Sequence, residues 1–284
     1  MSFAAAYGCL VLVQAGLVAT PGRPRRLRSS RVLGLVVPAS AMVVGVALAR
    51  AHGGGHFLAT LAAVATPLLA AGSGWARGWR LPLVPALAVP PLYAVAWLAE
   101  GTPAGAVAGV VLIAGACLAV TGLVAAFAPP RWLAVGLIVL VAVDVLLVWG
   151  TRQVAPTMNA LAAAQPPSLT HGGNPLPSLQ QIDLGSATMG WLDFAAPALL
   201  GLIVASRARA AVATGVAAAG WGLLLFVTSP IAATPPILAG LLTGLRRGVD
   251  RPRACRRASA SAASLAIGRP SRHSLRKAAY RISR

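Results

Sequence analysis

Long apolar stretches alternate along this chain with short polar segments that are rich in arginine, glycine and proline. A helix needs about 20 mostly apolar residues to cross a hydrocarbon core of about 30 Å, since each residue advances it by about 1.5 Å. The pattern therefore predicts an all-α polytopic membrane protein with about nine transmembrane helices, at residues 2–20, 32–51, 56–75, 81–99, 104–128, 132–150, 187–206, 210–229 and 231–245.

The placement of arginine predicts how these helices are oriented, because short positive loops stay on the cytoplasmic side of a membrane. Every second connection carries arginine, starting after the first span: Arg23, Arg25, Arg26, Arg28, Arg31, Arg77, Arg80, Arg131, Arg207 and Arg209. The opposite connections hold only Arg50 and Arg152. We therefore expect a multi-pass protein of the plasma membrane with its N-terminus outside and its C-terminus in the cytoplasm.

Three regions follow from the spacing of these segments. Residues 1–131 form a membrane region of five helices. Residues 132–245 hold the other four helices and one long outer loop, residues 151–186, and this region carries the candidate chemistry. Residues 246–284 are rich in arginine, serine and alanine, and we expect them to form a basic, disordered cytoplasmic tail.

The composition supports the membrane assignment and limits the possible partners. Hydrophobic residues make up 57% of the chain and charged residues only 10%, which excludes an ordinary soluble domain. The net charge of +19 comes from loops and tail, not from one helical face with aromatic residues, so we expect a lipid bilayer and no nucleic acid as partner. The scattered Cys9, Cys117 and Cys255 predict neither a disulfide framework nor a metal cluster.

Two of the five acidic residues, Asp144 and Asp193, lie inside predicted spans. An ionisable side chain at membrane depth costs roughly 2.5–3.5 kcal/mol on insertion scales, so it is a functional-site hypothesis by default. Each aspartate is about six residues from the outer end of its span, which predicts both carboxyl groups roughly 9 Å below the outer boundary. Facing like charges cannot both ionise at low dielectric, so one would act as acid and the other as base.

The residues around both aspartates resemble motifs of signal peptide peptidases and presenilins. The segment from Asp144 to Thr151, DVLLVWGT, resembles the family's sixth-helix motif, in which an aspartate precedes an apolar and aromatic run ending in Phe-Gly-Thr. The segment MGWLDF around Asp193 is similar to the Gly-x-Gly-Asp-Phe motif of the seventh helix. Pro236-Ile237-Leu238 stands where the family has Pro-Ala-Leu at the start of the ninth helix.

Three positions depart from the family pattern. Val143 stands where tyrosine usually precedes the first aspartate, Leu192 replaces the second glycine, and Ile237 replaces the alanine of the third motif. The predicted outside N-terminus corresponds to signal peptide peptidases, whose orientation is opposite to that of presenilins.

The resemblance implies an intramembrane aspartyl protease that hydrolyses peptide bonds of single-span membrane proteins or signal peptides, without a metal or an organic cofactor. It implies that Asp144 and Asp193 are catalytic. Substrate would contact the other motif residues, which are Gly190, Leu192, Pro236, Ile237 and Leu238.

A helix in lipid hides its peptide bonds in its own hydrogen bonds, so a protease must unwind it first. We expect an unwound substrate to add as a strand to an exposed backbone edge. The segment at 236–238 and the outer loop after Gly150 are the candidates for that edge.

Two other functions fit the same residues. An inactive relative acting as a membrane scaffold is favoured by Leu192, since a bulky side chain stands where close backbone approach is expected. A proton- or cation-coupled transporter could use the same aspartates. Such folds often contain repeated halves, and the aspartate-bearing segment has no second copy in the chain.

Overall fold

The computed structural model describes residues 3–20, 22, 24, 30–168, 175–184, 187–204, 206–227 and 234–246. Residues 1–244 form one compact unit, and residues 245–284 form a second. The basic tail from residue 247 onward lies outside the described residues, and so does its expected disorder. The division at residue 131 stays a prediction, and helices from both sides of it belong to the first unit.

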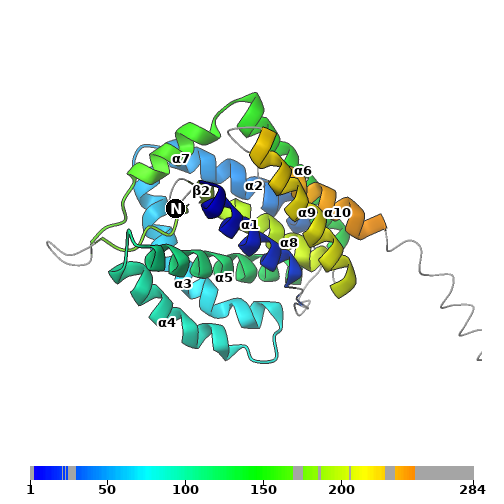
Figure 1. The fold of residues 1–284 in the computed structure, drawn as a ribbon, viewed down its shortest axis with the longest axis horizontal. Helices are drawn as coiled ribbons and strands as arrows, with labels where there is room; N and C mark the ends of the chain where they lie inside the picture. The colour runs from blue at the N-terminus through cyan, green and yellow to red at the C-terminus, as the bar shows by residue number, and fades with distance from the viewer. Residues whose placement is uncertain are drawn as a thin grey trace, which may run out of the picture. The chain divides into compact units, whose positions relative to one another are not determined.

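Each apolar segment of the sequence contains a helix (Figure 1). The helices are α1 (Phe3–Ala19), α2 (Arg31–Arg50), α3 (Gly54–Arg77), α4 (Leu83–Leu98), α5 (Pro103–Phe127), α6 (Pro130–Val145), α8 (Trp191–Val204), α9 (Arg207–Val227) and α10 (Pro235–Arg246). Within the described residues, four are long and apolar enough to cross a membrane: Arg31–Arg50, Gly54–Arg77, Pro103–Phe127 and Pro130–Gly150. The others contain shorter apolar helical stretches of 10–17 residues, and the stretch in α9 is Ala208–Leu224. The mostly helical fold is thus that of a membrane protein.

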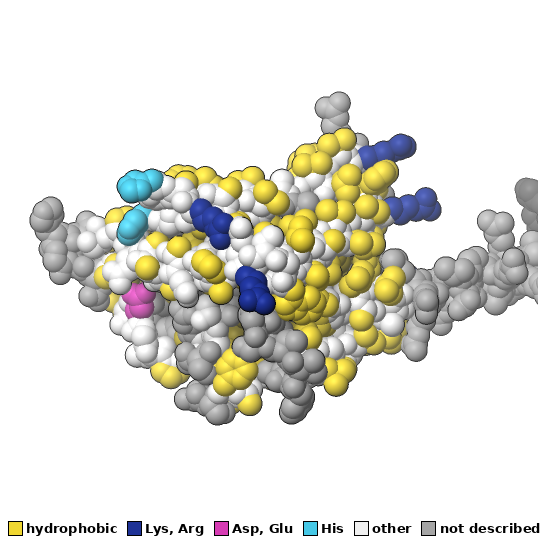
Figure 2. Space-filling model, turned by 90° about the horizontal axis from the view of Figure 1, so that it is seen from above, with side chains coloured by type: hydrophobic (Ala, Val, Ile, Leu, Met, Phe, Trp, Pro, Cys, Tyr) yellow, Lys and Arg dark blue, Asp and Glu magenta, His cyan; other side chains and the backbone are white. Residues whose placement is uncertain are grey.

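The surface of the bundle supports this assignment. Large apolar side chains are exposed along several helices, for example Leu12, Leu87 and Leu98, which are 72%, 76% and 77% exposed. Figure 2 shows hydrophobic side chains over much of the face in view and only a few charged ones. A soluble monomer rarely exposes so much apolar surface. We interpret these side chains as lipid-facing.

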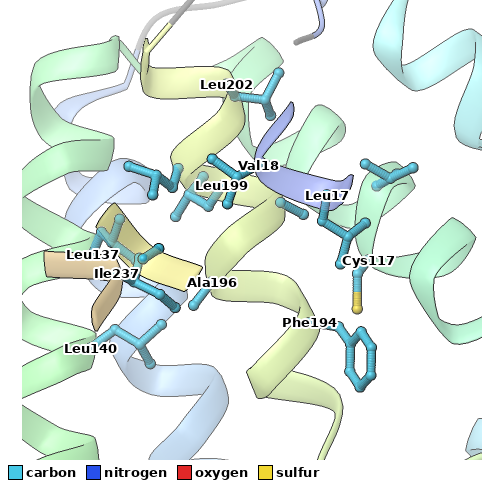
Figure 3. Close-up of a cluster of buried hydrophobic side chains, with 14 of the residues drawn as sticks. Leu17, Val18, Cys117, Leu137, Leu140, Phe194, Ala196, Leu199, Leu202 and Ile237 are labelled. Carbon is cyan, nitrogen blue, oxygen red and sulfur yellow. The ribbon is translucent and has the colours of Figure 1, made fainter. Parts of the chain in front are cut away.

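Inside the bundle, α8 lies at the centre of the main core. It packs against α1, α5 and α6, while α3 and α4 pack on the other side of α5 (Figure 1). Figure 3 shows the core around α8, to which α1, α5, α6, α8 and α10 contribute Leu17, Val18, Cys117, Leu137, Leu140, Phe194, Ala196, Leu199, Leu202 and Ile237. Helix α8 therefore lies among side chains from four other helices.

Glycine lets the helices approach closely at two contacts. A Cβ atom on Gly201 of α8 would lie 2.7 Å from the carbonyl oxygen of Val18 in α1. A Cβ atom on Gly136 of α6 would overlap the carbonyl oxygen of Gly34 in α2. Pro38 lacks the N–H that would bond that carbonyl in a regular helix. Close contact through small residues is typical of membrane helices, which gain little from hydrophobic burial against lipid.

The region expected as the outer loop, residues 151–186, contains regular structure. It holds α7 (Val154–Ala163) and strand β1 (Gln181–Leu184), and β1 pairs antiparallel with β2 (Ala187–Gly190). The seventh apolar helix was expected from residue 187, and this boundary is wrong, because residues 187–190 form β2 and the helix begins at Trp191. A short apolar run cannot be assigned to strand or helix from periodicity alone.

A buried arginine links four parts of the bundle through hydrogen bonds. Arg77 is the last residue of α3, and its side chain is fully buried. The guanidinium donates four hydrogen bonds of 2.9–3.2 Å, to the carbonyl oxygens of Thr20, Leu118 and Ala198 and to the hydroxyl of Thr121. The sequence placed Arg77 among the loop arginines, but its side chain points into the protein.

Candidate functional site

Asp144 lies where α6 ends. Its side chain is 6% exposed. The helix continues from Leu146 to Gly150 as a single π-helical turn, closed by a 2.8 Å hydrogen bond from the Thr151 N–H to the Leu146 carbonyl. Such π turns are rare and occur frequently at functional sites. The change of helix type therefore falls directly after the first aspartate.

Thr234 connects Asp144 to the third motif segment. It immediately precedes α10, is buried, and donates a hydrogen bond from its hydroxyl to Oδ2 of Asp144. The sequence motif at residues 236–238 does not include this residue. A threonine just before a proline pair that opens an apolar helix is in a typical helix-capping position, and this pattern could have identified Thr234 from the sequence.

Asp193 lies in the first turn of α8. Its Oδ2 accepts a 2.8 Å hydrogen bond from the N–H of Gly190, the residue that precedes the helix. An acid at the third helical position that bonds back to the N–H before the helix forms half of a capping box, and the helix dipole favours negative charge there. The expected depth of six residues into the helix is wrong, because Asp193 is only two residues after Trp191.

The two aspartates lie on helices that pack against each other, α6 and α8. The two carboxyl groups lie within the range at which buried charges interact. Glu100, by contrast, lies after α4, where its carboxylate accepts a long 3.4 Å hydrogen bond from the Ser178 N–H at the surface. The arrangement provides two carboxyl groups on packed helices, a buried one at Asp144 and a partly buried one at Asp193, each with oxygen lone pairs available for a third molecule.

Helix α1 contributes two polar side chains that the sequence analysis did not single out. Tyr7 and Gln14 are 4% and 0% exposed, and they lie seven residues apart, which places them on one face of the helix. The amide of Gln14 donates a 3.0 Å hydrogen bond to the backbone carbonyl of Asp193. Tyr7 lies within electrostatic range of the Asp193 carboxyl group.

The two predicted substrate-binding residues near Asp193 occupy different surroundings. Gly190 is partly buried, and a Cβ atom there would lie 3.7 Å from Oδ2 of Asp193 and 3.8 Å from Sδ of Met158 in α7. The side chain of Leu192 is also partly buried and packs against the main core. Whether either residue contacts a substrate stays a prediction.

The other three predicted substrate-binding residues open α10. Pro236 faces Gly220 of α9, where an added Cβ atom would lie 2.8 Å from the proline ring. Ile237 is fully buried with Leu137, Leu140 and Ala196 around it (Figure 3). Leu238 is partly buried against the same core. The substrate contacts of these residues also stay predictions.

The described part of the chain contains no group of three His, Cys, Asp or Glu side chains that could hold a metal ion. No family model, curated protein or solved structure matches the chain.

Proposed function

We propose that this protein is an intramembrane aspartyl protease of the signal peptide peptidase and presenilin type. In this proposal the nine apolar helices cross the plasma membrane, with the N-terminus outside and the C-terminus in the cytoplasm. The substrates are single-span membrane proteins or signal peptides, and the reaction needs no metal or organic cofactor. The observation that carries the proposal is the pair of carboxyl groups of Asp144, which is buried, and Asp193, which is partly buried, on packed helices and within electrostatic range.

The chemistry follows from two carboxyl groups that share one proton. The ionised aspartate removes a proton from a water molecule, and the water oxygen attacks the carbonyl carbon of the substrate. The protonated aspartate donates a hydrogen bond to the carbonyl oxygen as negative charge develops there. The C–N bond then breaks, and a proton moves from a carboxyl group to the leaving nitrogen. Activity therefore requires one proton on the pair and falls at pH values where both groups hold or both lack a proton.

The hairpin of β1 and β2 offers a way to present an unwound substrate. It runs directly into α8, so its last residue, Gly190, lies three positions before Asp193. A strand at the edge of a sheet has backbone groups free to pair with another extended chain. A substrate segment added at this edge would have its peptide bonds held extended beside the aspartates.

The test is cleavage of a tagged single-span peptide by the full-length protein, purified and reconstituted into liposomes. Asp144→Asn and Asp193→Asn should each lower the cleavage rate by roughly 10²–10⁴-fold, the usual contribution of general acid–base catalysis. Glu100→Gln removes an acid outside the site and is the matched control. Equal products from wild type and Asp193→Asn would overturn the proposal.

The same liposomes distinguish the transporter alternative. A proton-coupled carrier would acidify or alkalinise the vesicle interior when a pH gradient or a cation gradient is imposed, and Asp193→Asn would abolish this. Proton movement with no cleavage would favour the carrier. The absence of both activities in a folded protein would favour the inactive scaffold.

A further inference from the structure

A proline in α8 leaves the backbone carbonyl of the second aspartate without its helical partner. In an α-helix the carbonyl of residue i accepts from the N–H of residue i+4. For Asp193 that residue is Pro197, which has no N–H and lies inside the helix. The carbonyl is nevertheless hydrogen-bonded, because the side-chain amide of Gln14 donates to it at 3.0 Å.

The surroundings of Gln14 show that this contact is specific. The side chain is fully buried in an otherwise apolar helix, and α1 packs along α8 over this length. Its amide nitrogen also lies 3.7 Å from the sulfur of Met189, in β2. The donor end of Gln14 is thus directed at the segment that leads from the hairpin into the turn carrying Asp193.

The acceptor atom of the Gln14 side chain, unlike its donor, has no described hydrogen-bond partner. Oε1 of Gln14 is buried and has no hydrogen-bond partner among the described residues, and the hydroxyl of Tyr7 is in the same condition. Leaving a buried polar group unpaired is unfavourable, so glutamine is a costly choice where leucine or methionine would pack. A requirement for the donor end explains why the glutamine is there.

We infer that Gln14 is a positioning residue for Asp193, replacing the N–H that Pro197 removes from α8 and thereby fixing the first turn, which carries the Asp193 carboxyl group. The inference rests on the proposed function, but its structural part, the coupling between Gln14 and Pro197, can be measured without any proteolysis. In this inference α1 contributes a positioning residue to the candidate site.

A double-mutant cycle of Gln14→Met and Pro197→Ala in the full-length protein tests the inference. Methionine keeps the volume of Gln14 and removes its donor, and alanine at 197 restores the missing N–H. Gln14→Met should lower the melting temperature in detergent by a few degrees. In the Pro197→Ala background the same substitution should cost less than a third of that shift. Equal shifts in the two backgrounds would overturn the inference even if wild type cleaves no peptide.

Cleavage kinetics separate positioning from simple support of the fold. Gln14→Met should reduce kcat about tenfold or more with little change in KM, because a small misplacement of a catalytic group affects the chemical step. Adding Pro197→Ala should restore most of kcat. Leu12→Met, on the exposed face of α1, is the control and should leave both constants unchanged. A stable Gln14→Met enzyme with unchanged kcat would also overturn the inference.

Discussion

The protein buries two polar centres along the same helix, α8, and they differ in how fully their hydrogen bonds are used. Arg77 reaches the carbonyl of Ala198 and three other acceptors, so four of its five donors are paired. At the other centre, around Asp193 five residues earlier in α8, the Asp193 carboxyl group accepts a hydrogen bond from the Gly190 N–H, and the Asp144 carboxyl group accepts from Thr234. Tyr7 and Gln14 there keep unpaired polar atoms.

This difference suggests that the Arg77 centre supports the fold and that the aspartate centre serves the proposed function. Buried polar groups are nearly always paired, since an unpaired group costs about 1–3 kcal/mol. The paired centre around Arg77 joins α1, α3, α5 and α8 and leaves little capacity for another molecule. The aspartate centre keeps unpaired polar atoms on Tyr7 and Gln14 among the described residues at a cost in stability, which fits the proposed function.

The largest effect should come from Arg77→Lys. Lysine keeps the charge, but its compact ammonium cannot replace the planar fork that reaches four acceptors. Loss of one or two charge-assisted hydrogen bonds should lower the free energy of unfolding by about 2–4 kcal/mol. Thermal unfolding in detergent measures the change, and the fraction that stays folded should cleave substrate at the wild-type rate.

Arg77→Met provides the matched comparison. It removes the buried charge together with its bonds, and the removal of a desolvated charge offsets part of the loss. Arg77→Met should therefore be less destabilising than Arg77→Lys. The reverse order would show that the packing of the side chain outweighs its hydrogen bonds, and the proposed contrast between the two centres would then fail.

A smaller effect is expected from Thr234→Val, which keeps the shape of the side chain and removes the donor to Asp144. A hydrogen bond to a charged group contributes about 1.5–3 kcal/mol, so kcat should fall about tenfold or more. Thr243→Val is the control, because that hydroxyl bonds only to carbonyls of its own helix, α10. Kinetics in liposomes measure both. Equal kcat values for the two variants would remove Thr234 from the site.

The smallest effect on stability is predicted for Gly190→Ala. The added Cβ atom would meet its neighbours at 3.7 Å or more, an ordinary contact, so the free energy of unfolding should change by less than about 0.5 kcal/mol. Gly201→Ala in the packed core should cost about 1–3 kcal/mol, because its Cβ atom would lie 2.7 Å from a backbone oxygen. Thermal unfolding of the two variants compares free space at the site with close packing in the core.

The same substitution sharpens the prediction that Gly190 contacts substrate. If a substrate strand lies against this glycine, Gly190→Ala should raise KM several-fold while the fold stays intact. An unchanged KM would remove Gly190 from the predicted substrate-binding residues and leave its backbone N–H as its contribution to the site.

Hydropathy predicted where the helices lie because an apolar run is a local property of the sequence. It did not predict their lengths, since a span needs about 20 residues and only four of the described helices are long and apolar enough. The aspartates were identified for a similar reason, since acids are conspicuous in apolar segments. Residues 181–190 were missed because pairing of two short strands depends on chain segments meeting in space. The π turn after Asp144 could not be predicted either, because the spacing of apolar residues does not distinguish a π turn from an α-helix.

Two partners of the aspartates, Gln14 and Thr234, could not be predicted from sequence because they come from distant parts of the chain. Gln14 and Asp193 are 179 residues apart, and Thr234 and Asp144 are 90 apart. The bond from Gln14 is needed because Pro197, one turn after Asp193, cannot donate to the Asp193 carbonyl. The glutamine and the proline lie in different segments, so neither segment alone predicts their connection. A polar residue in an apolar helix does indicate a buried hydrogen bond, but the carbonyl or carboxylate that it bonds depends on how the helices pack.

The π turn at residues 146–150 also has a mechanical consequence. Because its hydrogen bonds span five residues instead of four, it holds one more residue than the same rise of α-helix. Conversion to α-helix would release that residue as slack of about 1.5 Å toward α7 and the hairpin. It would also rotate Gln153, which receives a hydrogen bond from Arg50 of α2, away from its partner. The connection after the first aspartate thus holds one residue of spare length, and the hydrogen bonds from Arg50 to Gln153 are among the contacts that restrain it.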